Sequence, residues 1–220
     1  MNKPTHTAEE IIEKLPLEDK IMNIYPYGSQ VYGTASKYSD HDFVLVAMKS
    51  MLTSGAFKNN AITSPDGLVQ GTVYSRGGFI DAINNYQMPA MECISLPEEM
   101  VVLSKKEFSV SKWDERQMIK SVVQQASKSR HIADKQSKSG SEQLRGDLKL
   151  RAAKGTYQAL RILMFGLQLK EHKKIVDFSE ANDLYHKMIP PIETIDVDEF
   201  TFDTRDYYDL FDGLKAKLEK

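Results

Sequence analysis

The run Asp42–Met48 (DFVLVAM) constrains the fold more than any other feature of this chain. After its first residue it is almost continuously apolar, and a short apolar run of this kind is typical of a strand covered on both faces. Such a strand belongs in a sheet that has helices packed on it. The chain is therefore expected to contain a domain of mixed strands and helices.

The remaining patterns divide the chain into two halves. Residues 21–27, 68–74, 91–96 and 100–103 read as further strands, and residues 8–15 and 76–86 read as helices, the first capped by Thr7. The second half reads as helices over residues 114–133, 144–169, 178–189 and 204–220, with a loop over 135–141. We expect an α+β protein with a small mixed-sheet domain over residues 1–108, followed by a helical domain over residues 109–220.

Composition narrows the class of protein. The 220 residues are 41% hydrophobic and 27% charged, which is ordinary for a soluble globular protein. The net charge of -2 argues against a basic protein that coats nucleic acid. The single cysteine, Cys93, cannot form an internal disulfide and reads as a small core residue. No stretch approaches the length of a membrane span or a signal sequence, so we expect a cytoplasmic location and no membrane partner.

The segment Tyr27–Val46 (YGSQVYGTASKYSDHDFVLV) carries the residues suited to chemistry. A strand leads into Gly28-Ser29, where glycine allows close approach of a phosphate and the start of a helical turn offers backbone donors. Asp40 and Asp42 open the next strand, and residues two apart on a strand project from the same face. The sequence thus predicts two carboxylates side by side, with His41 facing away.

Two adjacent carboxylates repel each other, and a divalent cation relieves that repulsion. Mg²⁺ takes oxygen ligands from carboxylates, phosphates and water. Asp40 and Asp42 are therefore predicted to hold Mg²⁺ or Mn²⁺, with a nucleoside triphosphate as the companion ligand. The alternative is a helix cap followed by a turn with solvated aspartates.

The pattern Gly28-Ser29, Gly33 and Ser39-Asp40-x-Asp42, followed by an apolar strand, resembles the DNA polymerase beta nucleotidyltransferase superfamily. The likeness extends, in stronger and weaker patches, over roughly residues 22–190. It is most similar to a bacterial and phage branch associated with RNA repair. The matching positions beyond the first motif are Tyr74, Phe79-Ile80, Met88-Pro89, Met91–Ile94 and Lys149–Leu169.

This resemblance implies a third carboxylate about four residues before Tyr74, and the chain has Gln70 there. Glutamine accepts hydrogen bonds but cannot act as a general base at neutral pH. Glu92, expected in an apolar strand, is our choice for the third catalytic carboxylate, with an ion pair to a helix as the structural alternative. Asp66, in a turn, and Asp81, on the solvent side of a helix, are weaker candidates.

Phosphate and base contacts are expected from Gly28, Ser29 and Ser39, and from cationic side chains further along the chain. Lys154 and Arg161 lie two helical turns apart, with Tyr157 between them as a residue that could stack on a base. Arg76 is a further candidate of the same standing. The competing interpretation of all three basic residues is a solvated helix surface.

The sequence favours a metal-dependent nucleotidyltransferase that moves a nucleoside monophosphate onto an acceptor. The resemblance points to an RNA end or tRNA as acceptor, while a small molecule or a protein side chain remain open. A catalytically weak or inactive nucleotide-binding relative, such as an antitoxin-like regulator, is the alternative that Gln70 supports. A hydrolase of phosphate esters using the same carboxylates is a third interpretation.

Overall fold

The computed structural model describes residues 6–15, 21–48, 61–138, 145–191, 194, 196 and 200–220. Two units make up the chain, one over Met1–Trp113 and the other over Asp114–Lys220. The sequence placed this boundary at residue 108, and the structure places it after Trp113. The first unit carries the sheet and the second is helical, so the α+β fold class expected from the sequence is confirmed.

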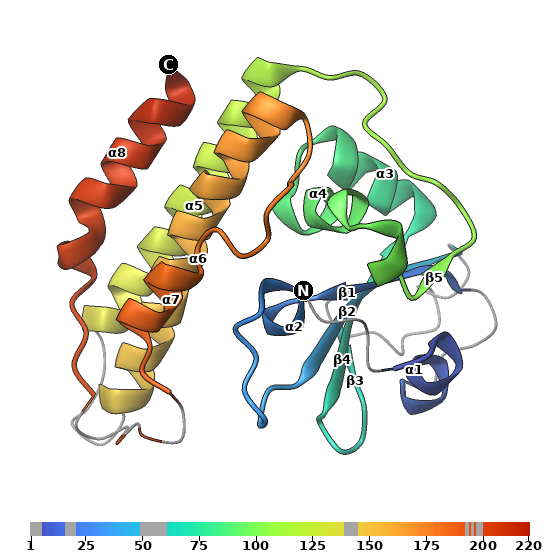
Figure 1. Ribbon diagram of the computed structural model, residues 1–220, viewed down its shortest axis with the longest axis horizontal. Helices are drawn as coiled ribbons and strands as arrows, with labels where there is room; N and C mark the ends of the chain where they lie inside the picture. Colours follow the sequence, from blue (N-terminus) through green and yellow to red (C-terminus); the bar gives the residue numbers. More distant parts are fainter. Residues whose placement is uncertain are drawn as a thin grey trace. The chain divides into compact units, whose positions relative to one another are not determined.

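The first unit begins with helix α1 (Ala8–Lys14), for which Thr7 and Glu10 form the reciprocal hydrogen bonds of a capping box. The other elements follow in chain order (Figure 1). They are β1 (Ile21–Tyr27), α2 (Ser29–Tyr32), β2 (His41–Ala47), β3 (Ala61–Thr63), β4 (Val69–Ser75), α3 (Arg76–Asn84), α4 (Met88–Ser95), the 3₁₀ helix η2 (Glu98–Met100) and β5 (Leu103–Ser104).

The five strands form one mixed sheet in the order β3-β4-β2-β1-β5. Strand β2 is central, pairing antiparallel with β1 and parallel with β4. In this register Asp42 lies opposite Tyr27 on one side and opposite Gln70 on the other. The first residues of β2 are therefore held by hydrogen-bonded neighbours at both edges.

Helices cover both faces of the sheet, as the apolar run of β2 predicts (Figure 1). Phe43, Leu45 and Ala47 belong to a core cluster with α1. Val44 and Val46 belong to the opposite cluster, with α3 and α4. By the two-residue period of a strand, Asp42 projects with Val44 towards the α3 and α4 side, and His41 projects with Phe43 towards α1. The ring of His41 indeed lies 4.6 Å from that of His6, just before α1.

One predicted strand is wrong. Residues 91–96 belong to α4, a helix with Pro89 in its first turn, and not to a strand. A short apolar run fits a buried helix as well as a buried strand, and proline in the first turn is a helix signal. Residues 100–103 were likewise expected as a strand, but they close η2 and reach only the start of β5.

The second unit contains two long helices and a shorter set that follows them. These elements are α5 (Glu115–Lys138), α6 (Arg145–His172), α7 (Asn182–Met188), the 3₁₀ helix η5 (Thr204–Tyr207) and α8 (Tyr208–Glu219). Helix α5 runs through Lys135–Lys138, where the sequence was expected to form a loop. The rest of that expected loop, residues 139–141, lies outside the described residues.

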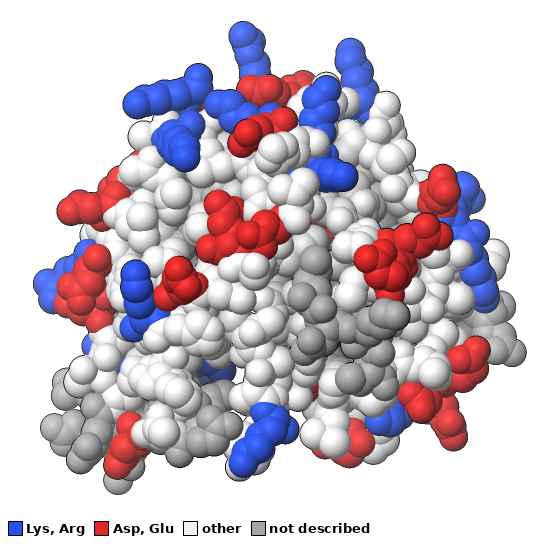
Figure 2. Space-filling view, in the orientation of Figure 1, with Lys and Arg blue, Asp and Glu red and all other residues white. Residues whose placement is uncertain are grey.

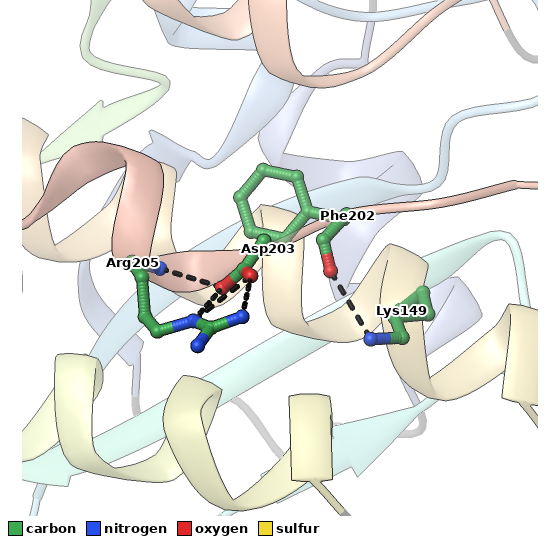
Figure 3. Close-up of polar contacts among 4 residues, drawn as sticks. All are labelled: Lys149, Phe202, Asp203 and Arg205. Atoms are coloured by element: carbon green, nitrogen blue, oxygen red, sulfur yellow. Dashed lines mark hydrogen bonds and ion pairs between the residues drawn. The ribbon is translucent and has the colours of Figure 1, made fainter.

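Small residues let α5 and α6 approach closely. A Cβ placed on Gly155 would lie 3.1 Å from the Cβ of Ala133, and one on Gly166 would lie 2.6 Å from a methyl group of Val122. The segment before α8 is fixed to α6 by Lys149, whose ammonium donates to the carbonyl of Phe202 over 3.2 Å (Figure 3). These contacts bury Phe202 and Leu218 and complete the helical core.

Asp203 starts η5 by accepting from the backbone N–H and the guanidinium of Arg205 (Figure 3). These hydrogen bonds lower the pKa of Asp203 to about 2. Charges of both signs appear among uncharged residues on the face of the molecule in Figure 2. Across the described parts of the chain, no helix combines the length and the apolar character that a membrane crossing requires.

Candidate functional site

The Gly28 turn lies directly against the carboxylate of Asp42. Gly28 follows β1 and precedes α2, with φ +74 and ψ -153, a conformation that L side chains rarely adopt. A Cβ at this position would collide with the Asp42 carboxylate and lie 3.2 Å from the Asp42 Cβ. Glycine is therefore required here both by the backbone and by the space that Asp42 occupies.

Asp40 lies on the same side of the chain as Asp42 and is joined to the neighbouring strand through Gln70. The Gln70 amide Nε2 donates to Asp40 Oδ2 over 2.6 Å. This bond fixes the orientation of the amide, because an ionised carboxylate only accepts hydrogen bonds. The glutamine at the expected third-carboxylate position thus supplies a donor to the acidic pair.

Burial and the neighbouring Asp40 both disfavour the ionised form of Asp42. Burial, followed by the charge of Asp40, raises the pKa of Asp42 to about 6 from its usual value of 3.8. No described Lys, Arg or His forms an ion pair with either aspartate. Two like charges held together in partly buried surroundings favour binding of a proton or a metal ion.

Helix α2 positions the remaining part of the Gly-Ser turn. The carbonyl of Gly28 accepts from the N–H groups of Val31 and Tyr32, over 3.0 and 3.2 Å, and the turn ends at Gly33 in the left-handed conformation. Ser29 is the first residue of α2 and is partly exposed. First-turn N–H groups have no partner inside a helix, so the turn can present donors to an anion.

Ser39 has a structural contact within the loop that leads to Asp40. Its hydroxyl oxygen accepts from the backbone N–H of Ser36 over 2.9 Å, and its own N–H donates to the Ser36 carbonyl over 3.1 Å. These two bonds close the loop just before β2. Ser39 is therefore a loop-closing residue in this structure.

Glu92 lies in α4 and not on the predicted strand. Its carboxylate is 2% exposed and accepts from the Tyr32 hydroxyl over 2.5 Å. Tyr32 ends α2, so the hydrogen bond connects α4 to the helix that begins at Ser29. The sequence analysis considered an ion pair with a lysine or arginine for Glu92. The donor in this contact is instead the phenol of Tyr32.

The candidate cations and the aromatic residue fall into two groups. Arg76, at the start of α3, and Lys154, on α6, are exposed. Tyr157 and Arg161 are buried, at 5% and 2% exposed, so they do not share an open cationic face with Lys154. Arg161 donates to Gln158 over 2.6 Å and lies 5.6 Å from the Tyr157 ring centroid.

The donor set around Asp42 fits a hard divalent cation. Mg²⁺ and Mn²⁺ prefer carboxylate oxygens, and Mg²⁺ is commonly held by one or two carboxylates together with substrate phosphates. Among the described residues, no group of three or more His, Cys, Asp or Glu side chains is placed to hold a metal together. Asp40 and Asp42 are the residues that would hold the ion, and a phosphate group would complete its coordination.

Two contacts of the site were not anticipated from the sequence. Gln70 was noted only as a missing carboxylate, although the pairing of β2 with β4 brings it to Asp40. Tyr32 was not singled out at all, because nothing in the sequence joins it to Glu92, 60 residues away. Cys93 is buried and burial raises its thiol pKa well above the usual value, which confirms its reading as a core residue.

Comparison with known proteins adds no relative. No protein-family model matches the chain, and no curated protein matches it significantly in sequence.

Proposed function

We propose that this protein is a metal-dependent nucleotidyltransferase that transfers a nucleoside monophosphate from a nucleoside triphosphate to an acceptor. The observation that carries the proposal is the contact between the Gly28 turn and Asp42. A phosphate-binding turn and a cation-binding carboxylate must lie side by side to handle a metal-bound triphosphate, and residues 14 positions apart meet here. The resemblance to the DNA polymerase beta superfamily agrees with this arrangement.

The residues divide the work in a simple way. Asp40 and Asp42 hold Mg²⁺ or Mn²⁺, which when bound neutralises charge on the triphosphate. Gly28 and Ser29 contact phosphate oxygens through the turn, and the exposed Arg76, in the same unit, is the candidate cation for the triphosphate. Gln70 holds Asp40 in orientation.

In the reaction, an acceptor oxygen attacks the α-phosphorus of the nucleotide, and the bond from that phosphorus to the pyrophosphate group breaks. Pyrophosphate leaves, and the acceptor hydroxyl proton passes to a base. An RNA end or tRNA is the acceptor that we propose, in a cytoplasmic setting.

The Gln70–Asp40 hydrogen bond favours a second candidate function, a nucleotide-binding regulator with little or no catalysis. An amide in place of a carboxylate removes one negative charge and one metal ligand from the site. The variant Gln70→Glu separates the two functions. If the missing carboxylate limits catalysis, this variant transfers label at least about tenfold faster than the wild type. A tenfold increase corresponds to an activation free energy lower by about 1.4 kcal/mol.

The direct test incubates the full chain with each α-labelled nucleoside triphosphate and Mg²⁺ or Mn²⁺, with and without RNA. We expect one nucleotide to yield labelled product and pyrophosphate. The variant Asp42→Asn should lose on the order of 10³-fold in rate, because several kcal/mol of charge stabilisation disappear. Asp209→Asn, the same change at an exposed position of α8, is the matched control and should keep full activity.

Three outcomes contradict the enzyme proposal. Nucleotide binding without transfer in both the wild type and Gln70→Glu leaves only the regulator. Release of free monophosphate with no adduct identifies a hydrolase. Transfer that survives Asp42→Asn shows that the acidic pair is not the catalytic centre.

A further inference from the structure

The outward face of α5 carries a row of basic side chains. Between Arg116 and Lys138 the exposed residues of this helix include five lysines or arginines and one histidine, and none is acidic. The basic members are Arg116, Lys120, Lys128, His131, Lys135 and Lys138. We call this set the α5 basic face.

Helix geometry places these residues on one side of α5. Their spacings of four, eight, three, four and three residues keep them within about a third of the helix circumference. The buried residues of α5 lie on the opposite side and form its packed face; they are Met118, Val122, Ala126 and Ala133. At a rise of about 1.5 Å per residue, the α5 basic face extends over roughly 33 Å.

Among the described residues, packing within the helical unit does not account for Arg116, Lys120 and Lys128 of this face. Arg130, which is not part of this face, has a structural role. It donates to Asp212 over 3.0 Å and lies over the rings of Tyr208 and Phe211. Within the described part of the chain, Arg116, Lys120 and Lys128 have no ion pair. Like charges spaced along one helix face repel one another, so a polyanion bound there would stabilise the helix.

The chemistry of the face selects among polyanions. An amphipathic helix that binds a membrane needs apolar residues beside its basic ones, and Ile132 is the one large apolar side chain that the described α5 exposes. A linear series of lysines and arginines matches the regularly spaced phosphates of a nucleic acid. We propose that the α5 basic face docks the sugar–phosphate backbone of a nucleic acid, which serves as the acceptor of the transferred nucleotide.

The role of this strand as acceptor rests on the proposed function, whereas docking itself does not. Binding is therefore measured without nucleotide or metal, by fluorescence anisotropy of a labelled single-stranded RNA of about 20 nucleotides over a range of KCl concentrations. For four to five phosphate contacts, the logarithm of the affinity should fall with the logarithm of salt with a slope of about -3. Single-stranded DNA should bind with a similar slope, since the contacts are to the backbone.

The variant combining Lys120→Glu, Lys128→Glu and Lys138→Glu should weaken binding about 100-fold or more at low salt and bring the slope to about -1. Its matched control carries Lys174→Glu, Lys187→Glu and Lys217→Glu, three exposed lysines on separate segments. Both variants change the net charge by the same amount. The control should stay within about threefold of the wild type.

Several results overturn the inference. Equal losses in the two triple variants show that net charge, and not the α5 basic face, governs binding. No RNA binding by the wild type removes the face as a docking site even if the protein proves to be a nucleotidyltransferase with another acceptor. Binding to vesicles with about 30% anionic lipid that is as tight as RNA binding, and as sensitive to the α5 changes, assigns the face to a membrane. Asp42→Asn should leave RNA binding intact, so a failure of catalysis and a failure of docking are separate results.

Discussion

Two sets of charged side chains, one in each unit, differ in the partners that they have. In the helical unit, Arg130 is paired with Asp212, and Arg205 with Asp203. In the sheet unit, Asp40 lies near Asp42 and accepts from the Gln70 amide, and the pKa of Asp42 rises to about 6. Charges that hold a fold together are given partners, whereas a pair of acids held in repulsion is a feature that a ligand can exploit.

After the loss of activity expected at Asp42, the largest effect is expected at Gly28, which lies against the Asp42 carboxylate. Gly28→Ala introduces a methyl group that collides with the Asp42 carboxylate and forces alanine into a positive φ. We expect at least about 100-fold loss of transfer, because even small misplacement of catalytic groups is costly. Unfolding in urea should show a loss of about 2–3 kcal/mol.

Gly67→Ala is the matched control for this variant. Gly67 has the same φ of +74, but a Cβ there meets nothing within 4 Å. It should lose only the cost of backbone strain, about 1 kcal/mol, with activity retained. Equal effects of the two substitutions on activity would show that the contact with Asp42 is of no functional importance.

The hydrogen bond from Tyr32 to Glu92 sharpens the comparison, because here the sheet unit does give a buried acid a donor. Tyr32→Phe removes that donor and should lower the free energy of unfolding by about 1–3 kcal/mol. Since α2 begins at Ser29, the KM for the nucleotide should also rise. Tyr86→Phe, which removes a longer bond of 3.3 Å to the Lys112 carbonyl, should have a smaller effect on stability and none on KM.

If KM is unchanged in Tyr32→Phe while stability falls, the bond from Tyr32 to Glu92 is purely structural. Glu92→Gln adds a second check, because glutamine still accepts from the Tyr32 hydroxyl. If Glu92→Gln keeps the wild-type KM for the nucleotide while Tyr32→Phe raises it, Glu92 is a residue that positions α2. A loss of kcat with an unchanged KM would instead indicate direct participation in catalysis.

The burial of Asp42 next to the charge of Asp40 should also affect the stability of the metal-free protein. Because folding raises the pKa of Asp42, its contribution is fully present below pH about 4 and is lost as the pH rises through about 6. Asp42→Asn should therefore be more stable than the wild type at pH 8 by about 1–2 kcal/mol, with little difference at pH 4. Urea unfolding at both pH values, in the presence of a chelator, measures this difference.

A wild type more stable than Asp42→Asn at pH 8 would contradict this prediction. It would mean that the ionised carboxylate contributes to folding even without a metal. In a separate measurement without chelator, addition of Mg²⁺ or Mn²⁺ should raise the stability of the wild type and leave that of Asp42→Asn unchanged. A ligand that binds only the folded state stabilises it.

The smallest effect is expected in the helical unit. Asp212→Asn removes an ion pair whose carboxylate is 65% exposed, and it should change the free energy of unfolding by less than about 0.5 kcal/mol. Arg130→Ala also removes the stacking on Tyr208 and Phe211 and should cost about 1 kcal/mol. Thermal or urea unfolding compares the two, and an Asp212→Asn effect as large as that of Arg130→Ala would show that the ion pair dominates.

The parts of the fold that the sequence predicts are those with a strong local pattern. The apolar run after Asp42, the N-cap at Thr7 and the long helices around residues 115–172 were all found. The helical nature of α4 was missed because its apolar run is too short to separate helix from strand by periodicity. The length of α5 was underestimated because lysine, serine and glutamine at its end are also common in loops.

Within the candidate site, the sequence predicted only the placement that follows from the strand period of two. That period places Asp42 on one side of β2, with Asp40 just before the strand, and His41 on the other. The bond from Gln70 to Asp40 depends on the parallel register of β2 and β4, and the bond from Tyr32 to Glu92 depends on how α4 packs. Pairings between distant segments leave no trace in a single sequence.

The register of β2 has a consequence for engineering the molecule. Asp42 is paired on both sides, with Tyr27 and with Gln70, so its position is set by the middle of the sheet. The segment from residue 34 to residue 38 only links α2 to that strand, and Ser36 and Ser39 close it locally. Grafts that keep this closure can therefore vary the segment's length and side chains without moving the acid that it precedes.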